Sequence, residues 1–289
     1  MLDDHMLRMI DWALKEDLGS GDCTSESSVP EGLQHEGYIL AKEAGIVAGI
    51  GVAREVFFRV DPEVTFEAQK EDGAAVQVGD VVIRIQGRAR SILAAERLAL
   101  NFMQRMSGVA TTTRRAMDVL AGTPTRVLDT RKTTPGLRAF EKWGVRLGGG
   151  VNHRMGLYDM ILIKDNHVDY AGGMTAALAG VKSYFDGGAP RVPVVVEVRS
   201  MDELNEALSA SHSERLPLER ILLDNFTPSQ VKNAVDHVSG RVPLEASGGI
   251  DLSNLRAYGE AGVDFVSMGA LTHSVKSLDL SLKTKASLT

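Results

Sequence analysis

The sequence predicts an α/β protein in which a region of mixed strand and helix order precedes a β/α barrel. Three observations lead to this prediction. From Arg126 onward, short apolar runs alternate with amphipathic helical segments, which is typical of a parallel sheet buried on both faces. Each of these runs leads directly into charged residues or glycines. The first third of the chain shows no such alternation.

The composition excludes several classes of protein. The 289 residues carry 32 Lys and Arg against 38 Asp and Glu, a formal net charge of −6, and no long basic stretch stands out. Binding to nucleic acid through phosphate neutralisation is therefore not expected. The single cysteine, Cys23, excludes an internal disulfide and a Cys-rich zinc site and is typical of a reducing compartment.

Neither a membrane span nor an export signal is expected. The most apolar stretch, residues 44–53, is ten residues long, whereas a membrane helix needs about 20. Asp3 and Asp4 stand where a signal peptide would carry Lys or Arg. We therefore expect a cytoplasmic protein that has no membrane partner.

The first third contains helices and strands in mixed order. Apolar residues recur at helical spacing from Met6 to Leu18, and Asp4 is placed to cap this helix. Gly108 is expected to interrupt the last helical segment of the region. The other expected elements are strands over 38–41, 45–49, 64–68 and 81–85, and helices over 52–59, 91–106 and from Gly108 to Leu120.

The remaining chain is expected to form six or seven βα units. Helices are predicted between the strands, for example over 201–210 and 228–238. A barrel with fewer than the usual eight strands fits this count, and an open doubly wound sheet is the alternative. The runs expected to be strands are 127–128, 160–163, 194–198, 221–223, 242–246 and 264–268.

Polar residues and glycines gather at the C-terminal ends of these runs. Strand ends of this kind meet at the mouth of a β/α barrel, which holds the active site. They therefore indicate one functional site built from several loops. The residues are Asp129-Thr130-Arg131-Lys132, Lys164-Asp165-Asn166-His167, Glu197, Asp224-Asn225, Ser247-Gly248-Gly249 and Gly269.

The late glycines are typical of phosphate-binding loops. Gly248-Gly249 precedes a helix expected over 251–261, and Gly269-Ala270 follows the next strand. Glycine lets backbone amides approach an anion, and a helix N-terminus adds its positive end. Tight turns without a ligand are the alternative.

A cluster of cations indicates a ligand with several negative groups. Arg131, Lys132, His153, Arg154 and Lys164 lie within 34 positions of a chain that is acidic overall. Arginine suits carboxylates because its planar fork binds two oxygens at once. Each cation alone could equally be a solvated surface residue.

Two carboxylates, Glu197 and Asp224, follow neighbouring strands. Such a pair can hold Mg²⁺ through oxygen atoms or stabilise a developing cation. Structural ion pairs are the alternative for both. Lys164 also allows a different reaction class, a Schiff-base aldolase of the barrel type, because a lysine at a strand end can attack a carbonyl.

The assembled motifs resemble the quinolinate phosphoribosyltransferase family, also called nicotinate-nucleotide pyrophosphorylase (carboxylating). The run Asp129–Arg138 and the block Leu162–His167 are the most specific segments. The resemblance covers nearly the whole chain. The other matching segments are Glu16–Gly19, Gln104–Gly108, His153-Arg154 with Gly156-Leu157, Leu244–Ile250 and Ser267–His273.

The resemblance implies a fold, an assembly and a reaction. The fold is an N-terminal α/β sandwich over 1–110, completed by about 275–289, and an incomplete, seven-stranded α/β barrel over 111–274. The reaction joins quinolinate to phosphoribosyl pyrophosphate (PRPP) with Mg²⁺ and gives nicotinate mononucleotide, CO₂ and pyrophosphate, a step of NAD biosynthesis. A homodimer is the implied minimal active unit, with a hexamer as a further assembly.

The resemblance also implies a role for each site residue. Arg131, His153, Arg154 and Lys164 surround the two carboxylates of quinolinate, and Lys132 lies between them and the pyrophosphate. Lys132, Glu197 and Asp224 are the implied catalytic residues, with the two carboxylates facing the ribose and the metal. Arg105 is implied to reach the site of a neighbouring subunit. The other implied substrate contacts are Thr130, Ser247, Gly248, Gly249, Met268, Gly269 and Ala270. A non-catalytic relative that binds a phosphorylated metabolite is the remaining alternative.

Overall fold

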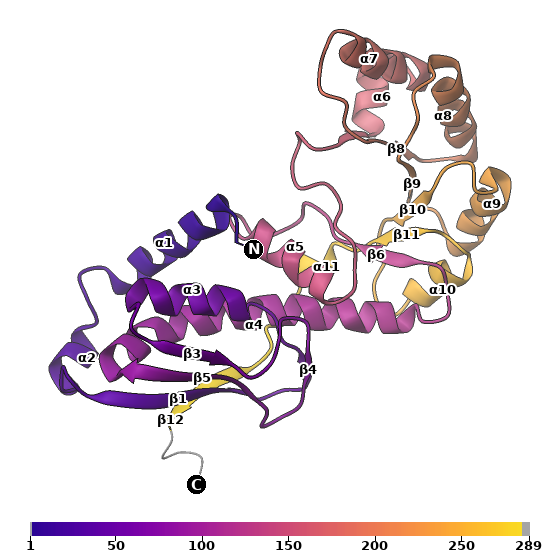
Figure 1. Ribbon diagram of the computed structural model, residues 1–289. Coiled ribbons are helices and arrows are strands. Elements are labelled where there is room, and N and C mark those ends of the chain that lie inside the picture. Colours follow the sequence, from indigo (N-terminus) through magenta and orange to yellow (C-terminus); the bar gives the residue numbers. More distant parts are fainter. Residues whose placement is uncertain (1, 285–289) are drawn as a thin grey trace. The chain divides into compact units, whose positions relative to one another are not determined.

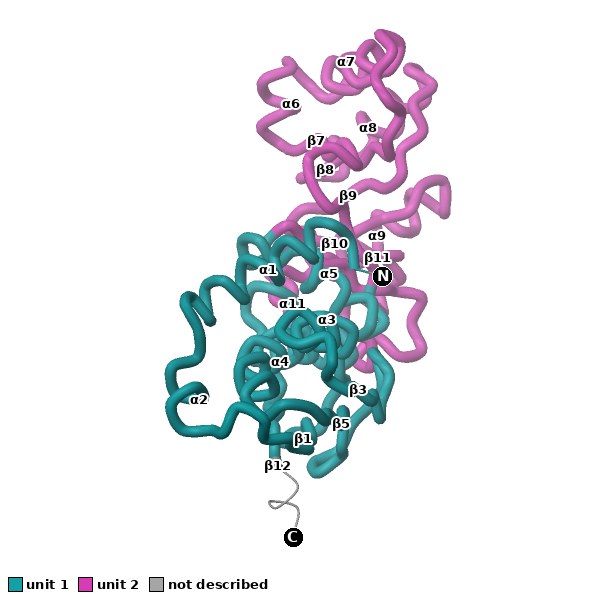
Figure 2. Tube along the Cα trace, turned by 60° about the vertical axis from the view of Figure 1, so that its left-hand side comes forward, with its two compact units in different colours: residues 1–114, 132–150, 271–289 teal, residues 115–131, 151–270 magenta. Residues whose placement is uncertain are grey.

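The computed structural model describes residues 2–284 (Figure 1). The chain divides into two compact units, coloured separately in Figure 2. Unit 1 contains residues 1–114, 132–150 and 271–289, and unit 2 contains residues 115–131 and 151–270. Each unit has its own sheet and is described by itself.

The sheet of unit 1 is antiparallel and has four strands in the order β12-β1-β5-β3. These strands are β1 (Gln34–Ala41), β3 (Thr65–Ala68), β5 (Val81–Arg88) and β12 (Leu280–Thr284). A two-stranded ladder joins β2 (Gly45–Ile46) to β4 (Ala75–Val76). The C-terminal segment therefore completes this sheet through β12, which pairs with β1. The expected completion by residues 275–289 includes 285–289, which lie outside the described residues.

Among residues 2–284, five helices other than the short α11 (Ala270–His273) belong wholly or partly to unit 1. They are α1 (Asp4–Leu18), α2 (Cys23–Ser28), α3 (Ile50–Val60), the N-terminal part of α4 (Ala89–Val119) and α5 (Arg138–Leu147). The apolar faces of α3 and α4 supply fully buried residues such as Phe57 and Met103 to one core with Ile39 and Ile83 of the sheet. The mixed order of strands and helices predicted for this region is confirmed.

Two details of unit 1 differ from the prediction. The cap of α1 is Asp3, which accepts a hydrogen bond from the Met6 backbone N–H at 2.8 Å, and not Asp4. Helix α4 runs without interruption through Gly108. A Cβ at Gly108 would lie 2.4 Å from the Lys276 carbonyl oxygen, so glycine serves close packing at this position and does not end the helix.

The segment 132–150 packs with unit 1, although the expected boundaries place it within the contiguous range 111–274. Its helix, α5, buries Phe140 against Phe102 of α4, with ring centroids 4.9 Å apart. A Cβ at Gly144 would lie 2.9 Å from the Met106 carbonyl oxygen. The two helices therefore approach closely because one carries a glycine where they meet.

The sheet of unit 2 is parallel and has six strands in the order β6-β11-β10-β9-β8-β7. A parallel bridge between Leu128 and Val151 adds a further pairing position beyond β6. The predicted parallel sheet is confirmed, with six strands plus Val151 in place of the seven complete strands expected. The strands are β6 (Arg126–Leu128), β7 (Ile161–Ile163), β8 (Val194–Val198), β9 (Arg220–Asp224), β10 (Leu244–Ser247) and β11 (Phe265–Ser267).

Helices follow most of these strands. They are α6 (Asp165–Ala171), α7 (Met174–Asp186), α8 (Met201–Glu214), α9 (Pro228–Val238), α10 (Leu255–Glu260) and the short α11 (Ala270–His273) at the boundary of the units. Helix α9 has the predicted bounds because Thr227 and Gln230 form a capping box and Pro228 occupies the first turn. Among residues 2–284, no helix has both the length and the apolar character of a membrane span.

The strand register gives the sheet of unit 2 two chemically different faces. Residues paired in parallel strands point to the same face, and neighbours in one strand point to opposite faces. Glu197 pairs with Leu222, and Leu222 also pairs with Glu245, so these three residues share a face. The other face consists of apolar residues, for example Val196 and Ile221, which are fully buried. Polar chemistry is therefore confined to one face of this sheet.

Candidate active site

Four of the predicted site residues lie on the polar face, at the C-terminal ends of neighbouring strands. Asp224 is two residues beyond Leu222, and it pairs with Ser247. Lys164 is two residues beyond Leu162, whose partner Val195 lies two residues before Glu197. Alternation along the strands places all four side chains on the same side of the sheet.

Lys164 and Glu197 form an ion pair across the ends of β7 and β8. The distance from Lys164 Nζ to Glu197 Oε2 is 2.8 Å, and the carboxylate is 8 % exposed. The family resemblance implies that Lys164 contacts the dicarboxylate and that Glu197 faces the ribose. Their contact brings these two expected subsites next to each other within unit 2.

Arg131 and Arg154 are close enough to repel each other. Arg154 is nearly buried, with 9 % of its surface exposed. Burial lowers the pKa of the Arg154 guanidinium, and the positive charge of Arg131 lowers it further. Asp159 acts in the opposite direction. A buried guanidinium held close to a second, exposed cation provides a site for an anion.

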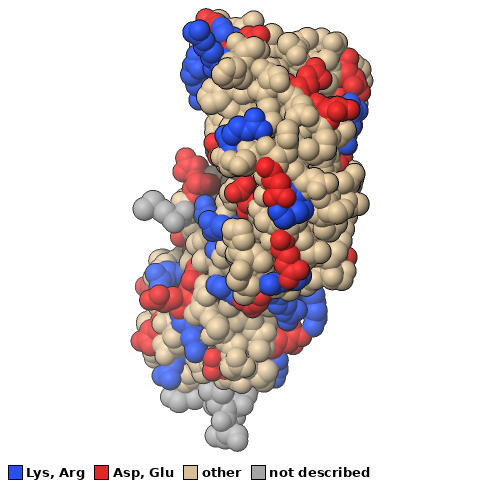
Figure 3. All heavy atoms as spheres, turned by 90° about the vertical axis from the view of Figure 1, so that its right-hand side faces the viewer, with Lys and Arg blue, Asp and Glu red and all other residues tan. Residues whose placement is uncertain are grey.

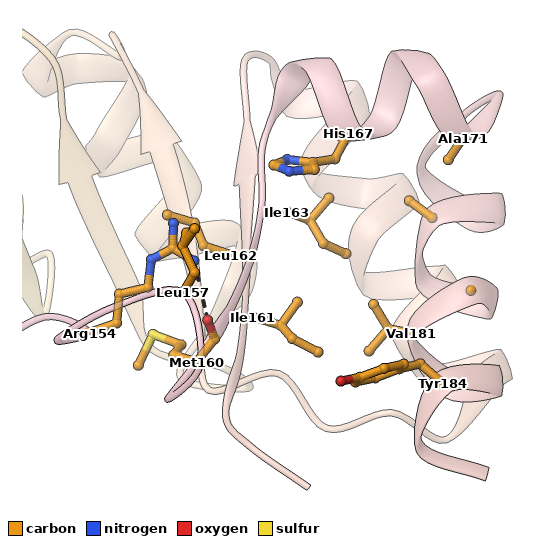
Figure 4. A pocket seen from close by; sticks show the side chains of 12 residues that line it. Arg154, Leu157, Met160, Ile161, Leu162, Ile163, His167, Ala171, Val181 and Tyr184 are labelled. Atoms are coloured by element: carbon orange, nitrogen blue, oxygen red, sulfur yellow. Dashed lines mark hydrogen bonds between the residues drawn. The ribbon is translucent and has the colours of Figure 1, made fainter. Parts of the chain in front are cut away.

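The loop that carries Arg154 is fixed at several points. The Asp159 carboxylate accepts the backbone N–H groups of Met155 and Gly156 at 2.7 and 2.8 Å. Arg154 Nη1 donates to the Met160 carbonyl oxygen at 3.2 Å, the bond drawn dashed in Figure 4. The guanidinium therefore has a defined position before any ligand binds.

An apolar pocket of about 420 Å³ separates β7 from α7, and Arg154 lies at its edge. In Figure 4, Ile161 and Ile163 face Val181 and Tyr184 across this space, while the Arg154 guanidinium lies on the opposite side of β7. The pocket wall supplies no second cation for an anionic ligand. The charged chemistry lies on the polar face of the sheet.

His153 is buried between two anchored groups. Its Nδ1 accepts the backbone N–H of Arg154 at 2.7 Å, and its Nε2 lies 3.6 Å from Glu245 Oε2. The backbone N–H of His153 donates to Asp129 Oδ1 at 2.9 Å. The ring therefore contacts groups of unit 2 on both of its nitrogen atoms.

The glycines after β10 adopt backbone conformations that favour glycine. Gly248 has a φ of +105° and Gly249 a φ of +59°. A Cβ at Gly248 would lie 2.1 Å from Asn225 Oδ1, whereas one at Gly249 would meet nothing within 4 Å. Gly248 is therefore fixed by Asn225, and the open space at Gly249 leaves room for a ligand.

The helix expected over 251–261 is shorter than predicted. Helix α10 begins at Leu255, because Asp251 to Asn254 form a turn in which Asn254 Oδ1 accepts the Asp251 N–H at 2.9 Å. The prediction that a helix N-terminus directly follows the glycines was wrong. The backbone amides of the loop are the groups that remain available to an anion.

The other predicted contacts of unit 2 surround the ends of β6 and β11. Thr130 lies between Leu128, the last residue of β6, and Arg131. Met268 is buried, and its backbone N–H donates to the Leu128 carbonyl oxygen at 2.9 Å. Gly269 and Ala270 follow Met268 directly and lead into α11.

Arg105 and Lys132 belong to unit 1. Arg105 contacts Glu141 of α5, with Nε and Nη2 at 3.0 and 2.7 Å from Glu141 Oε1, and Glu141 is fully buried. Glu141 also accepts the Thr134 backbone N–H at 3.0 Å. The Lys132 carbonyl oxygen accepts a hydrogen bond from Thr272 Oγ1 at 2.8 Å. Arg105 thus helps to hold the segment that carries Lys132.

Comparisons with known proteins find similarity along most of the chain. Residues 22–107 match the family described as quinolinate phosphoribosyl transferase, N-terminal domain, and residues 109–283 match its C-terminal domain. The chain belongs to the quinolinate phosphoribosyltransferase family. Unit 1 contains residues from both matched ranges, whereas unit 2 lies wholly within the range 109–283.

Individual relatives of this quinolinate phosphoribosyltransferase family cover nearly all of the chain. A tobacco (Nicotiana tabacum) protein named quinolinate phosphoribosyltransferase [decarboxylating] 1b is 46% identical over 95% of this chain and 81% of its own length. The nicotinate-nucleotide pyrophosphorylase [carboxylating] of Mycobacterium leprae is 44% identical over 93% of this chain and 94% of its own. The crystal structure of NadC from Streptococcus pyogenes has a TM-score of 0.91 at 39% identity, covering 98% of this chain and 97% of its own.

The carboxylates of this quinolinate phosphoribosyltransferase can supply only part of a metal site. Among residues 2–284, no group of three or more His, Cys, Asp or Glu side chains is arranged to hold a metal ion. Glu197 and Asp224 are two oxygen donors at adjacent strand ends. Two protein carboxylates suit Mg²⁺ when water and substrate phosphates complete its coordination.

Three buried acids organise the site; Asp129 was among the predicted strand-end residues, whereas sequence reasoning missed Glu245 and Glu141. Asp129 holds the backbone of His153, Glu245 faces its ring, and Glu141 holds Arg105. Glu245 interrupts an otherwise apolar strand, and that was the available signal. Glu141 gave no such signal, because its partner is 36 positions away along the chain.

Proposed function

We propose that the polar strand ends of unit 2 bind quinolinate beside PRPP and join the two with loss of CO₂, giving nicotinate mononucleotide. Phosphoribosyl transfer to quinolinate with decarboxylation is the activity of the family to which the chain belongs.

The observation that carries the proposal is the crowding of Arg131 and Arg154. Burial of Arg154 and repulsion from the exposed Arg131 both disfavour the charged form of Arg154, as its lowered pKa reflects. A ligand with two carboxylates removes that penalty and binds each guanidinium through charge-assisted hydrogen bonds. Lys164 supplies a third cation at the neighbouring strand end. Quinolinate, a pyridine with two adjacent carboxylates, has the matching charge.

Glu197 and Asp224 would stabilise the sugar. Departure of pyrophosphate leaves positive charge on C1′ and on the ring oxygen of the ribose. A fixed carboxylate close to these atoms is more favourable in the transition state than in the ground state, and so lowers the barrier. The ion pair of Glu197 with Lys164 supports this arrangement, because it joins the sugar side to the dicarboxylate side.

The loop Ser247-Gly248-Gly249 would hold the 5′-phosphate, with Met268, Gly269 and Ala270 on the neighbouring strand end. Backbone amides in a glycine loop bind phosphate without a cationic side chain. The open space at Gly249 supports this role. Thr130 would contact the substrate beside Arg131.

The chemistry then proceeds in two steps. The bond between C1′ and the pyrophosphate oxygen breaks, pyrophosphate leaves with the electron pair, and the pyridine nitrogen forms a bond to C1′. The ring nitrogen is now cationic. The bond from ring carbon 2 to its carboxylate breaks, CO₂ leaves, the electron pair stays on that carbon beside the cationic nitrogen, and a proton replaces the carboxylate. Holding both substrates in contact lowers the entropic cost of their encounter.

Mg²⁺, bound with PRPP and facing Glu197 and Asp224, would supply positive charge to the leaving pyrophosphate. Lys132 would supply a cation to the same phosphates.

We also propose a homodimer in which Arg105 reaches the neighbouring site, and a cytoplasmic location. The dimer proposal rests on the family resemblance. The contacts of Arg105 with Glu141 give Arg105 a role within its own subunit as well.

The aldolase alternative for Lys164 has less support. A Schiff base requires an amine that is free to attack a carbonyl, whereas Lys164 Nζ forms an ion pair with the Glu197 carboxylate at 2.8 Å. A non-catalytic relative is also disfavoured, because the chain carries Arg131, Arg154, Glu197 and Asp224 together.

The test is an assay with quinolinate, PRPP and Mg²⁺ in which pyrophosphate, CO₂ and nicotinate mononucleotide are measured together. We expect equal amounts of the three products. Arg131→Ala should abolish most of this activity, while Arg191→Ala, a change at an exposed arginine of the same unit, should leave it unchanged. Absence of nicotinate mononucleotide with the wild-type protein would contradict the proposal.

A further inference from the structure

We propose that His153 and His167 act as positioning residues, each of which holds the backbone amide of a substrate-binding cation, and that His153 does so as a neutral ring. His153 holds Arg154, and His167 holds Lys164. This inference rests on the proposed function of these two cations and replaces the expectation that His153 is itself a cation for the dicarboxylate.

The two histidines make the same contact. Nδ1 of His153 accepts the Arg154 backbone N–H at 2.7 Å. Nδ1 of His167 accepts the Lys164 backbone N–H at 3.0 Å, in the manner of a capping box at the start of α6. A nitrogen that accepts a hydrogen bond presents a lone pair and carries no proton. For His153, this contact places the ring proton on Nε2.

Buried groups reinforce this assignment at His153. Its Nε2 lies 3.6 Å from Oε2 of Glu245, a fully buried residue. Glu245 is fixed in turn by Arg220, whose Nε donates to Oε2 at 3.1 Å, and by the Ser267 hydroxyl, which donates to Oε1. The N–H on Nε2 thus points toward an anchored carboxylate. The positive charge of Arg220 already neutralises the Glu245 carboxylate, so the carboxylate does not require a second proton on His153.

The anchored ring explains how Arg154 keeps its position despite repulsion from Arg131. Asp129 holds the backbone of His153 at 2.9 Å, the ring of His153 holds the backbone of Arg154, and Met160 holds the guanidinium at 3.2 Å. Three successive contacts fix both ends of one side chain. With the Arg154 side chain held at both ends, its guanidinium is oriented to form hydrogen bonds with a substrate carboxylate.

Lys164 is controlled in a similar way. Its amide is held by His167, and its Nζ is held by Glu197 at 2.8 Å. His167 is exposed to solvent, unlike His153. The positioning role at this second site therefore depends on the capping contact alone.

Paired substitutions test the inference through calorimetric binding of quinolinate. Asparagine at 153 can still accept the Arg154 amide, and lysine at 153 keeps a positive charge but cannot accept. We expect His153→Asn to bind within about threefold of wild type and His153→Lys to bind at least about tenfold more weakly, since one lost hydrogen bond costs about that factor. In the same way His167→Gln, which restores a capping box, should bind better than His167→Ala.

Nitrogen-15 spectra of histidine-labelled protein without substrate give an independent readout. The signal that disappears in His153→Asn should be that of a ring protonated on Nε2 and bare on Nδ1. A doubly protonated ring, or tight quinolinate binding by His153→Lys with loss in His153→Asn, would overturn the inference. Equal binding by all four variants would reduce both histidines to structural roles and overturn it as well. Failure of the wild-type protein to bind quinolinate would instead contradict the proposed function, while the spectra would still test the ring assignment.

Discussion

Substitution of Gly248 tests the phosphate loop through its backbone. Gly248→Ala adds one methyl group at a φ of +105°, and that carbon would lie 2.1 Å from Asn225 Oδ1 and 3.0 Å from Asn225 Cα. The unfavourable backbone costs about 1–3 kcal/mol, and overpacking against Asn225 adds about 1–3 kcal/mol. The free energy of unfolding should therefore fall by about 2–6 kcal/mol, the sum of these two ranges.

Gly249→Ala is the matched control in the next residue. Its φ of +59° lies in the left-handed region, and its Cβ would meet nothing within 4 Å, so its cost should be about 1–2 kcal/mol. Urea unfolding of both variants measures the difference. The double variant Gly248→Ala with Asn225→Gly should recover part of the lost stability, because the nearest contact atom is removed. Equal stability of the two single variants would refute the role assigned to Asn225.

Three further predictions address binding, acid stability and assembly. Arg154→Ala should weaken quinolinate binding about 30-fold or more, since removal of one partner of a buried charge pair costs about 2–5 kcal/mol, and titration calorimetry measures this loss. The Arg88 hydrogen bond holds the pKa of Asp61 at about 2, below its usual value. Asp61 therefore stabilises the fold above about pH 4, and this stabilisation is lost as the pH falls toward 2. In acid unfolding, the free energy of unfolding of Asp61→Asn should decrease less over that pH range than that of the wild type. Arg105→Ala mixed with Lys132→Ala should regain activity through hybrid dimers, and inactivity after proven subunit exchange would argue against a shared site.

Much of unit 2 could be predicted from the sequence because strand periodicity and side-chain chemistry agree there. A parallel strand buried on both faces is apolar until it ends, so the first polar residue marks its C-terminal end. Lys164, Glu197, Asp224 and Ser247 were found in this way, and the register places them on one face. These four site residues could therefore be predicted from one local pattern, an apolar strand followed by a polar residue, which recurs along the chain.

The features that were missed depend on contacts between distant parts of the chain. Gly108 looks like a helix break in the sequence, but it allows the carbonyl of Lys276 to approach α4. Helix α5 joins unit 1 because Phe140 packs on Phe102. A local sequence pattern cannot show which distant residue will pack against a given position. Glu245 was missed because the site was predicted from residues at the C-terminal ends of strands, and Glu245 lies within a strand.

Surface charge could be judged well from composition. Acidic and basic side chains are interspersed over the face of the molecule in Figure 3, in keeping with the small net charge. The cations near the strand ends of unit 2 include the buried Arg154 and the exposed Arg131 and Lys164. Their role was visible in the sequence only through their spacing along the chain.

The central claim is that Arg131, Arg154 and Lys164 together recognise two carboxylates on one ring. Titration calorimetry of quinolinate against nicotinate, which lacks the second carboxylate, tests it most directly. Charge-assisted hydrogen bonds contribute about 1.5–3 kcal/mol each, so quinolinate should bind about 10- to 100-fold more tightly, and Arg154→Gln should narrow that gap. Equal affinity of the wild-type protein for the two acids would contradict the claim.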